Sequence, residues 1–118
     1  MAEHLLLVED EHDLRDLLTY LFETNGYRVS AVRTGEEALE VCQADSPDIL
    51  VLDVALPGMS GLEVCARLRS AELPVLMLSS LDKDDQAIAG LRVGADDYVR
   101  KPFNHKELLL RLEKLLNR

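Results

Sequence analysis

The sequence has few basic residues and no long apolar run, and each shortage excludes a class of protein. It contains 13 Lys and Arg against 22 Asp and Glu, for a formal net charge of -9. A domain this acidic repels a phosphate backbone, so we expect no direct binding of nucleic acid. No apolar stretch approaches the roughly 20 residues that cross a bilayer, and the first residues lack the charged start and cleavage site of a signal peptide. We therefore expect a cytoplasmic chain that makes no membrane contact and whose partners are proteins, cations or small molecules.

Cysteine motifs, repeats and flexible linkers are also missing. Cys42 and Cys65 are not part of a CxxC motif, so ordinary buried thiols are the simplest interpretation. The histidines His4, His12 and His105 have no mutual spacing suited to a metal ion. With 118 residues, 47% of them apolar, the chain suits one domain over residues 1–118 with a single core, which excludes a multidomain enzyme.

Short apolar runs of strand length alternate with longer stretches of helical periodicity. The runs cover residues 5–8, 28–32, 49–52, 75–78 and, more weakly, 98–99. The first helix is expected to end at Asn25-Gly26, a typical C-terminal cap, and Thr34 with Glu37 predicts a capping box for the second. The other three helices are predicted to begin at Ser60, near Asp82 and at Asn104, where Glu107 stands at the capping-box position.

This alternation predicts an α/β fold. Continuous apolar strands need no polar face, so they favour a parallel sheet that is covered by helices on both sides. Five strand-helix units in a chain of this length fit a flavodoxin-like doubly wound sheet, with strand order 2-1-3-4-5 and five helices. A barrel needs eight such units.

Polar residues follow four of the five predicted strands. Glu9 and Asp10 follow the first, Asp53 the third, Ser79 the fourth and Lys101 the fifth. Because the carboxyl ends of parallel strands share one edge of the sheet, we expect these side chains to lie together. Each residue alone also fits a structural role, as an acid near a helix N-terminus, a turn residue, a strand-end hydroxyl or a solvated charge. Their joint placement favours a functional site.

Three clustered carboxylates repel one another unless a cation lies among them. Mg²⁺ is the expected cation, because it prefers hard oxygen ligands and needs only one or two carboxylates. Such a site, with an ammonium group and a hydroxyl nearby, is suited to a phosphoryl group whose phosphorus a carboxylate attacks in line. The pattern predicts transfer of a phosphoryl group onto an aspartate.

Six stretches, in a specific order and spacing, carry a family resemblance. They are Leu6-Leu7-Val8-Glu9-Asp10-Glu11, Leu52-Asp53, Leu56-Pro57-Gly58-Met59-Ser60-Gly61, Pro74-Val75-Leu76-Met77-Leu78-Ser79, Gly94-Ala95-Asp96-Asp97-Tyr98 and Lys101-Pro102-Phe103. With them the chain resembles, over essentially its whole length, the receiver domain of bacterial two-component response regulators.

The resemblance implies roles for individual residues. Asp53 matches the phosphoacceptor, which takes its phosphoryl group from a phosphohistidine of a sensor histidine kinase or phosphotransfer protein. Glu9 and Asp10 match the acidic pair that holds Mg²⁺ (or Mn²⁺) together with Asp53, and the backbone carbonyl of Ala55 matches the remaining protein ligand. Lys101 matches the lysine that contacts the phosphoryl oxygens. The chain would then be a signalling domain, not an enzyme, that catalyses only its own phosphorylation and dephosphorylation.

Ser79 matches the switch hydroxyl of this family, and Tyr98 matches its switch aromatic residue. A phosphoryl group adds a charge of about -1.5 to -2 and three acceptors, so Ser79 can gain a hydrogen bond by moving toward Asp53. Tyr98 can then turn into the vacated space, which changes the surface formed by the fourth helix, the last strand and the fifth helix. Pro102 matches a position that usually follows a cis peptide bond.

The stretches from residue 94 onward are most similar to the OmpR/PhoB subfamily, whose receivers dimerise through this surface and control a winged-helix DNA-binding domain. Asp96, Asp97, Glu107 and Arg111 match the dimer surface, where an Asp and the Arg pair between subunits. Ala87 stands where a basic residue is common, which leaves Glu107 without its usual partner. The resemblance implies a homodimer on phosphorylation and control of transcription. The sequence leaves open whether the chain is a stand-alone regulator or is followed by a C-terminal effector domain outside this chain.

Three alternatives share parts of the pattern. A haloacid-dehalogenase-like phosphohydrolase has a second acid two residues after its nucleophile, where this chain has Ala55. A flavodoxin-like flavin carrier needs a phosphate loop where this chain has the acidic residues 9–11. A receiver that acts as a binding module without phosphorylation lacks acidic or lysine residues that are present here. In the receiver family, Ala55 and Leu81 occupy positions that tune phosphate lifetime, and because neither can position a water molecule we expect slow self-dephosphorylation.

Overall fold

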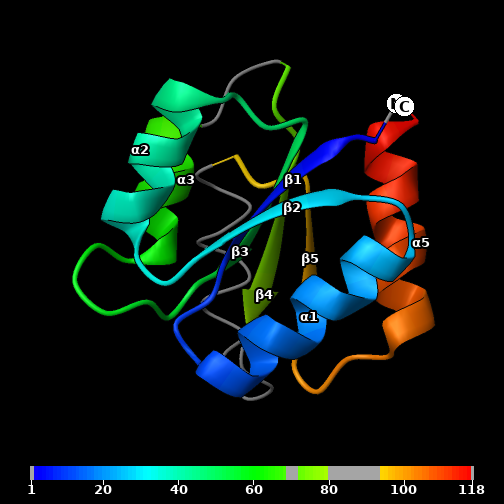
Figure 1. Ribbon diagram of the computed structural model, residues 1–118. Coiled ribbons are helices and arrows are strands. Elements are labelled where there is room, and N and C mark those ends of the chain that lie inside the picture. The colour runs from blue at the N-terminus through cyan, green and yellow to red at the C-terminus, as the bar shows by residue number, and fades with distance from the viewer. Residues whose placement is uncertain (1, 69–71, 80–93, 118) are drawn as a thin grey trace.

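The computed structural model describes residues 2–68, 72–79 and 94–117, which form a three-layer α/β fold (Figure 1). Its elements in chain order are β1 (His4–Val8), α1 (His12–Thr24), β2 (Arg28–Val32), α2 (Gly35–Ala44), β3 (Ile49–Asp53), α3 (Gly61–Leu68), β4 (Val75–Ser79), β5 (Asp97–Arg100) and α5 (His105–Leu116). All neighbouring strands are parallel, in the order β2-β1-β3-β4-β5. Helices α2 and α3 cover one face of the sheet, and α1 and α5 cover the other. The predicted flavodoxin-like sheet and its strand order are confirmed.

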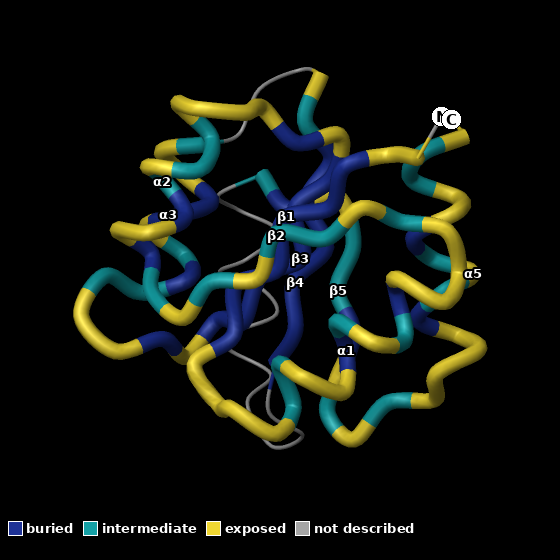
Figure 2. The backbone as a smooth tube through the Cα atoms, in the orientation of Figure 1, coloured by how far each residue is buried: buried dark blue, intermediate teal, exposed yellow. Residues whose placement is uncertain are grey.

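The apolar side chains divide into two clusters, one on each face of the sheet. Successive side chains of a strand point to opposite faces. Leu6 and Val8 of β1 therefore pack with α2 and α3, whereas Leu5 and Leu7 pack with α1 and α5. Strands β1, β3 and β4 are buried along their full length, as the dark blue centre of Figure 2 shows. Where the composition suggested one core, the sheet separates the apolar residues into two.

Two sequence signals set the ends of α1 and α2 as predicted. Helix α1 ends at its C-cap Asn25, and Gly26 follows with a φ of 95°. Thr34 and Glu37 form the capping box of α2. The amide of Glu37 donates to Oγ1 of Thr34 over 3.1 Å, and the amide of Thr34 donates to Oε1 of Glu37 over 3.2 Å.

Helix α5 differs from the expectation in one respect. Asn104 caps it and accepts hydrogen bonds from the amides of Lys106 and Glu107. The Glu107 carboxylate does not complete a capping box but lies 3.4 Å from Nε of Arg111. The helix predicted near Asp82 lies outside the described residues. Over residues 2–68, 72–79 and 94–117, no helix combines the length and apolarity that a bilayer span requires.

Helix α3 begins against the end of β3, at a contact that only glycine fits. The amide of Gly61 donates to the carbonyl oxygen of Val54 over 2.9 Å. A Cβ atom at Gly61 would overlap the carbonyl oxygen of Asp53 and would lie 2.8 Å from Cα of Val54. Ser60, where the helix was predicted to begin, accepts from the amide of Glu63 over 3.2 Å. The glycine contact therefore fixes the backbone at the carboxyl end of β3.

We expect Gly61→Ala to lower the free energy of unfolding by about 1–3 kcal/mol, because the added methyl group must displace the backbone of Asp53. The sign of the change in unfolding free energy is informative, because a Gly to Ala substitution inside a helix ordinarily stabilises a protein by up to about 1 kcal/mol. Urea denaturation measures the change. Gly26→Ala is the control, because nothing lies within 4 Å of its Cβ position and its cost is backbone strain alone, about 1 kcal/mol. A Gly61→Ala protein as stable as the wild type would contradict the contact.

Candidate functional site

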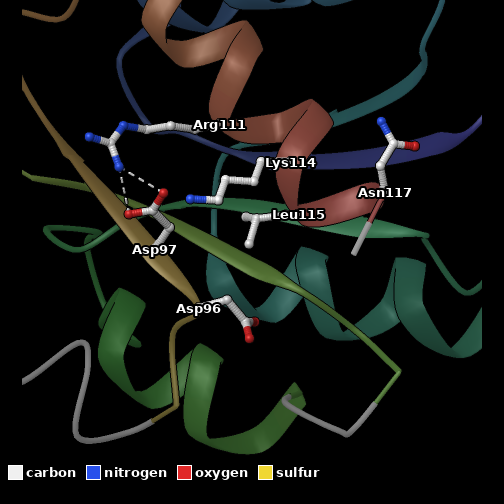
Figure 3. A pocket seen from close by; sticks show the side chains of 6 residues that line it. All are labelled: Asp96, Asp97, Arg111, Lys114, Leu115 and Asn117. Carbon is white, nitrogen blue, oxygen red and sulfur yellow. Dashed lines mark hydrogen bonds and ion pairs between the residues drawn. The ribbon is translucent and has the colours of Figure 1, made fainter.

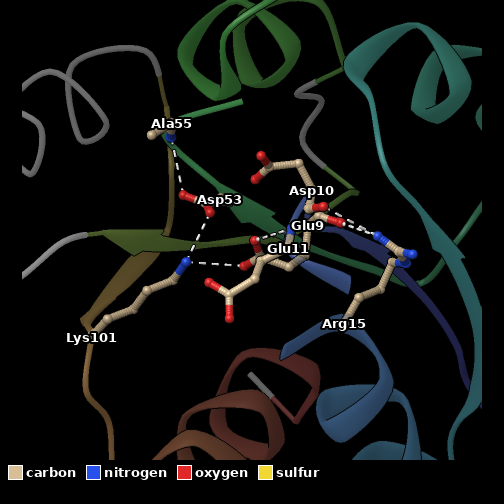
Figure 4. Close-up of polar contacts among 7 residues, drawn as sticks. All are labelled: Glu9, Asp10, Glu11, Arg15, Asp53, Ala55 and Lys101. Carbon is tan, nitrogen blue, oxygen red and sulfur yellow. Dashed lines mark hydrogen bonds and ion pairs between the residues drawn. The ribbon is translucent and has the colours of Figure 1, made fainter. Parts of the chain in front are cut away.

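Three carboxylates meet at the carboxyl edge of the sheet. Glu9 and Asp10 directly follow β1, and Asp53 is the last residue of β3, the strand that pairs with β1. One carboxylate oxygen of each residue lies within 4.8 Å of the others, and Figure 4 shows the two chain segments converging. Glu9 and Asp53 are buried, whereas Asp10 is exposed. The structure thus places the three predicted acids in one cluster that is open to solvent at Asp10.

Lys101 reaches this cluster from the end of β5. Its Nζ donates to Oε1 of Glu9 over 3.0 Å and to Oδ2 of Asp53 over 2.8 Å. Its amide donates to the carbonyl oxygen of Ser79 over 2.7 Å, which ties the residue to the end of β4. A cis peptide bond joins Lys101 to Pro102, as the family resemblance implies. Because the Lys101 side chain is only 24% exposed, water screens these two ion pairs poorly.

Backbone amides hold the remaining oxygens of the buried carboxylates. The amide of Ala55 donates to Oδ1 of Asp53 over 3.0 Å, and the amide of Glu11 donates to Oε2 of Glu9 over 3.1 Å. Each buried carboxylate therefore has one oxygen on the ammonium group and the other on an amide. Within the part of the chain that the structure describes, the Asp10 carboxylate makes no hydrogen bond, which leaves it available to a ligand.

Burial and crowding alter the proton affinity of the cluster. Loss of hydration, and then the charge of Asp53, raise the pKa of Glu9 from 4.5 to about 7, against the lowering effects of the Glu11 amide and Lys101. Burial lowers the pKa of Lys101, but hydrogen bonds and charge interactions with Asp53 and Glu9 outweigh it, so that this pKa is raised. The acids exceed the single ammonium group, and this excess favours a further cation.

Comparison with known proteins identifies the family. The response regulator receiver domain family matches residues 5–113. The chain belongs to this family. The response regulator MprA of Mycobacterium ulcerans is 46% identical over 120 residues, which cover all of this chain and 52% of that protein. The alkaline phosphatase synthesis transcriptional regulatory protein PhoP of Bacillus subtilis is 42% identical and is covered over 50% of its length. Both are OmpR/PhoB-type regulators, and this receiver domain spans about half the length of the curated relatives it matches.

Solved structures share the fold of this receiver domain. A putative response regulator from Chloroflexus aurantiacus superimposes with a TM-score of 0.95 at 37% identity, over the full length of both chains. NtrX from Brucella abortus superimposes with a TM-score of 0.93 at 31% identity, over 99% of this chain and 27% of NtrX. The predicted family is therefore confirmed by sequence and by structure.

The two predicted switch residues of the receiver domain lie on β4 and β5. Ser79 is buried at the end of β4 and pairs with Arg100 of β5. Tyr98 is half-buried and packs at the edge of the cluster that α2 and α3 cover. Its hydroxyl oxygen accepts a hydrogen bond from Nε of Arg100 over 2.9 Å. Their roles in switching stay predictions.

The four residues predicted for the dimer surface make contacts within the receiver domain itself. Nη1 of Arg111 donates to both carboxylate oxygens of Asp97, over 2.9 and 2.8 Å, and Nε of Arg111 lies 3.4 Å from Glu107. Asp96 accepts from the amide of Val75 over 2.8 Å, at the start of β4. Pairing between subunits stays a prediction, and Ala87 lies outside the described residues.

A surface hollow of about 590 Å³ lies between β5 and α5 (Figure 3). The Asp97–Arg111 ion pair spans part of its wall. The residues that line it are Asp96, Asp97, Arg111, Lys114, Leu115 and Asn117. Because none of them belongs to the acidic cluster, the hollow is separate from the site around Lys101.

Three groups that shape the site were not predicted from the sequence. Two are the backbone amides of Ala55 and Glu11, which carry no signal in the sequence. The third is the side chain of Arg15, whose Nη1 lies 3.1 Å from the carbonyl oxygen of Glu9. The signal that could have revealed Arg15 is its place one turn into the helix that directly follows the acidic run.

Glu9 makes the stability of the receiver domain depend on pH. Because folding raises the pKa of Glu9 to about 7, the folded protein binds this proton more tightly than the unfolded chain does. The stability that the proton provides is present below about pH 4.5, the ordinary value, and is lost as the pH rises through about 7.

Glu9→Gln abolishes this loss, because the amide does not ionise. Without divalent metal, we expect Glu9→Gln to stabilise the domain relative to the wild type by about 1–3 kcal/mol more at pH 8 than at pH 5. Urea denaturation at the two pH values measures the difference. Glu63→Gln, on the exposed surface of α3, is the control and should show no comparable dependence. A Glu9→Gln effect of equal size at both pH values would rule out the raised pKa.

Proposed function

We propose that Asp53 is the phosphoacceptor of this receiver domain. It takes a phosphoryl group, in a Mg²⁺-dependent reaction, from a phosphohistidine of a sensor histidine kinase or phosphotransfer protein. The observation that carries the proposal is the Lys101 bridge, in which one ammonium group lies 2.8 Å from Asp53 and 3.0 Å from Glu9. The ammonium group can neutralise phosphoryl oxygens, and the further acids can hold a divalent cation that does the same. A carboxylate with these neighbours is suited to accept a phosphoryl group.

In the proposed reaction Asp53 is the nucleophile. A carboxylate oxygen of Asp53 forms a bond to phosphorus while the bond from phosphorus to the donor histidine nitrogen breaks. The imidazole leaves with the electron pair of that bond and takes up a proton from solvent. Lys101 offsets the charge of the phosphoryl oxygens, and the amide of Ala55 holds the Asp53 carboxylate in one orientation.

The acidic cluster fits a divalent cation. Its three carboxylate oxygens lie within 4.8 Å of one another, and such hard oxygen donors with an exposed side suit Mg²⁺, which retains several of its waters. Glu9, Asp10 and Asp53 would hold the ion, with the backbone carbonyl of Ala55 as a further ligand, and Mn²⁺ can substitute. The bound ion would neutralise negative charge on the transferring phosphoryl group.

Phosphorylation is read out on the surface that includes β5 and α5. Ser79 moves toward the new acceptor oxygens and Tyr98 turns inward, which biases a two-state packing arrangement. Residues 1–118 act as one receiver domain in the cytoplasm and do not themselves bind nucleic acid. The chain spans about half of the curated relatives' length, which supports a C-terminal effector domain beyond it, control of transcription and a homodimer on phosphorylation.

The function is that of a signalling domain, which catalyses only its own phosphorylation and dephosphorylation. A haloacid-dehalogenase-like hydrolase is the enzyme alternative, since it also forms an aspartyl phosphate. It needs a second acid two residues after the nucleophile, and this chain has Ala55 there. The structure brings the amide of Ala55, which is not a proton donor to a leaving group, onto Asp53.

Incubation with acetyl phosphate and Mg²⁺ should add the mass of one phosphoryl group to the wild type and none to Asp53→Ala, as measured by intact mass spectrometry. Lys101→Ala should acquire the group more slowly, because its ammonium group no longer offsets the phosphoryl charge. Asp16→Asn, an exposed acid on α1, is the matched control and should behave as the wild type does.

Two results would contradict this proposal. Equal labelling of Asp53→Ala would place the phosphoryl group elsewhere, and no labelling of the wild type would remove the phosphoacceptor function. Multiple turnover of a phosphate ester would instead favour the hydrolase.

Slow self-dephosphorylation is expected, because the methyl side chain of Ala55 cannot orient an attacking water beside Asp53. Ala55→Asn and Leu81→Glu supply polar groups at the two tuning positions, the second of which lies outside the described residues. We expect each to shorten the half-life of the phosphorylated domain several-fold, as a mass-spectrometric time course after removal of the donor would show. A wild-type half-life no longer than that of either variant refutes the expectation.

A further inference from the structure

The Arg15 side chain contacts the backbone of the acidic residues and has no role in the function described above. Its Nη1 donates to the carbonyl oxygen of Glu9 over 3.1 Å and lies 3.4 Å from the carbonyl oxygen of Asp10. Lys101 contacts the same segment through the side chain of Glu9. In Figure 4 the acidic segment therefore lies between two cations, one on its carboxylates and one on its backbone.

Helix α1 explains why Arg15 reaches this segment. Side chains on a helix lean toward its N-terminus, and Arg15 stands one turn after the N-cap Glu11, whose carbonyl oxygen accepts from the Arg15 amide over 2.9 Å. The helix is anchored by Leu18 and Phe22, which are fully buried. Arg15 thus joins the acidic segment to a rigid element of the fold.

The contacts of Arg15 are directed to the backbone alone. Its guanidinium group pairs with no carboxylate among residues 2–68, 72–79 and 94–117, although three acidic residues, 9–11, lie close to it in the chain. Hydrogen bonds from a charged donor are stronger than those between neutral groups. By bonding to the carbonyl groups of Glu9 and Asp10, Arg15 restricts the backbone conformation of these two residues. That conformation determines the direction in which their side chains leave the backbone.

We infer that Arg15 is a positioning residue for the metal site: by holding the carbonyl groups of Glu9 and Asp10, it keeps their carboxylates converged with Asp53 for Mg²⁺. The inference rests on the proposed function, because it assumes that this cluster binds the ion. Residues that orient metal ligands typically contribute 10- to 100-fold to metal affinity. Arg15 acts through the backbone of its ligands, so we expect the lower end, about tenfold.

A purely electrostatic role for Arg15 has the opposite sign. A positive charge beside a cation site repels the cation, so its removal would strengthen Mg²⁺ binding. Loss of positioning instead weakens binding. The direction of the change in affinity therefore separates the two roles.

Isothermal titration of Mg²⁺ into the metal-free domain tests the inference without any phosphodonor. We expect Arg15→Ala to bind Mg²⁺ about tenfold more weakly than the wild type, and Arg15→Lys, which keeps the charge and one donor group, to lie between them. Arg67→Ala on α3 changes the net charge equally and, among the described residues, removes a surface pair with Glu63, so it should match the wild type. Asp10→Asn, which removes the negative charge of a proposed ligand, shows how far affinity falls when the site itself is altered.

Thermal unfolding without metal provides a second measurement. Arg15→Ala should melt close to the wild type when Mg²⁺ is absent and should gain less stability when Mg²⁺ is added, since the stabilisation by a ligand rises with the logarithm of its affinity. Unchanged or tighter Mg²⁺ binding by Arg15→Ala would overturn the inference and leave the proposed function intact. Absence of Mg²⁺ binding by the wild type would overturn both.

Discussion

The Lys101 bridge between two buried carboxylates is the interaction on which the rest of the site depends. Glu9 and Asp53 have lost almost all contact with water, and buried charges of like sign repel strongly when nothing lies between them. One ammonium group touches both, and one amide supports each remaining oxygen. Removing a partner that leaves a buried charge uncompensated typically costs about 3–5 kcal/mol, and loss of the ammonium group would leave both carboxylates in that state. The cluster is thus held together by the same group that we propose meets the phosphoryl oxygens.

The position of this cluster follows from the way the sheet is built. Strands β1 and β3 are neighbours at the centre of the sheet and are buried along their full length, so the acidic side chains of the site stand at or just beyond their carboxyl ends. Gly61 adds a second constraint, because α3 begins in contact with the backbone at the end of β3. The rigid backbone therefore determines where the acidic side chains lie, and it keeps them close together although they repel one another.

The sequence predicted those features that depend on periodicity and on the ends of elements. Continuous apolar runs such as residues 49–52 indicated buried parallel strands, and the shared direction of those strands indicated that Asp53 would lie near Glu9 and Asp10. The Thr34–Glu37 capping box was also predictable, because it depends on two residue types at a fixed spacing. These features are local, or are consequences of strand direction alone.

Contacts between a side chain and a distant or backbone partner were not predictable in this way. Arg15 bonds to carbonyl groups, which every residue has, so its place one turn after the acidic run does not by itself identify its partners. The proton affinity of Glu9 depends on how completely the folded chain excludes water from it. The internal contact of Arg111 with Asp97 was not predicted for another reason: the resemblance implies a pairing of these residues between subunits, which stays a prediction beside the contact within the chain.

That internal contact changes the energetics of any self-association through β5 and α5. Each subunit already pairs Arg111 with its own Asp97, and it must break this ion pair before Arg111 can pair with Asp97 of a second copy. The exchange of partners therefore leaves the number of ion pairs unchanged. The ion pairs would then determine how two copies are oriented. The favourable free energy of association would have to come from burial of apolar surface, such as the largely exposed Leu110 on α5. Self-association of this kind would respond only weakly to added salt.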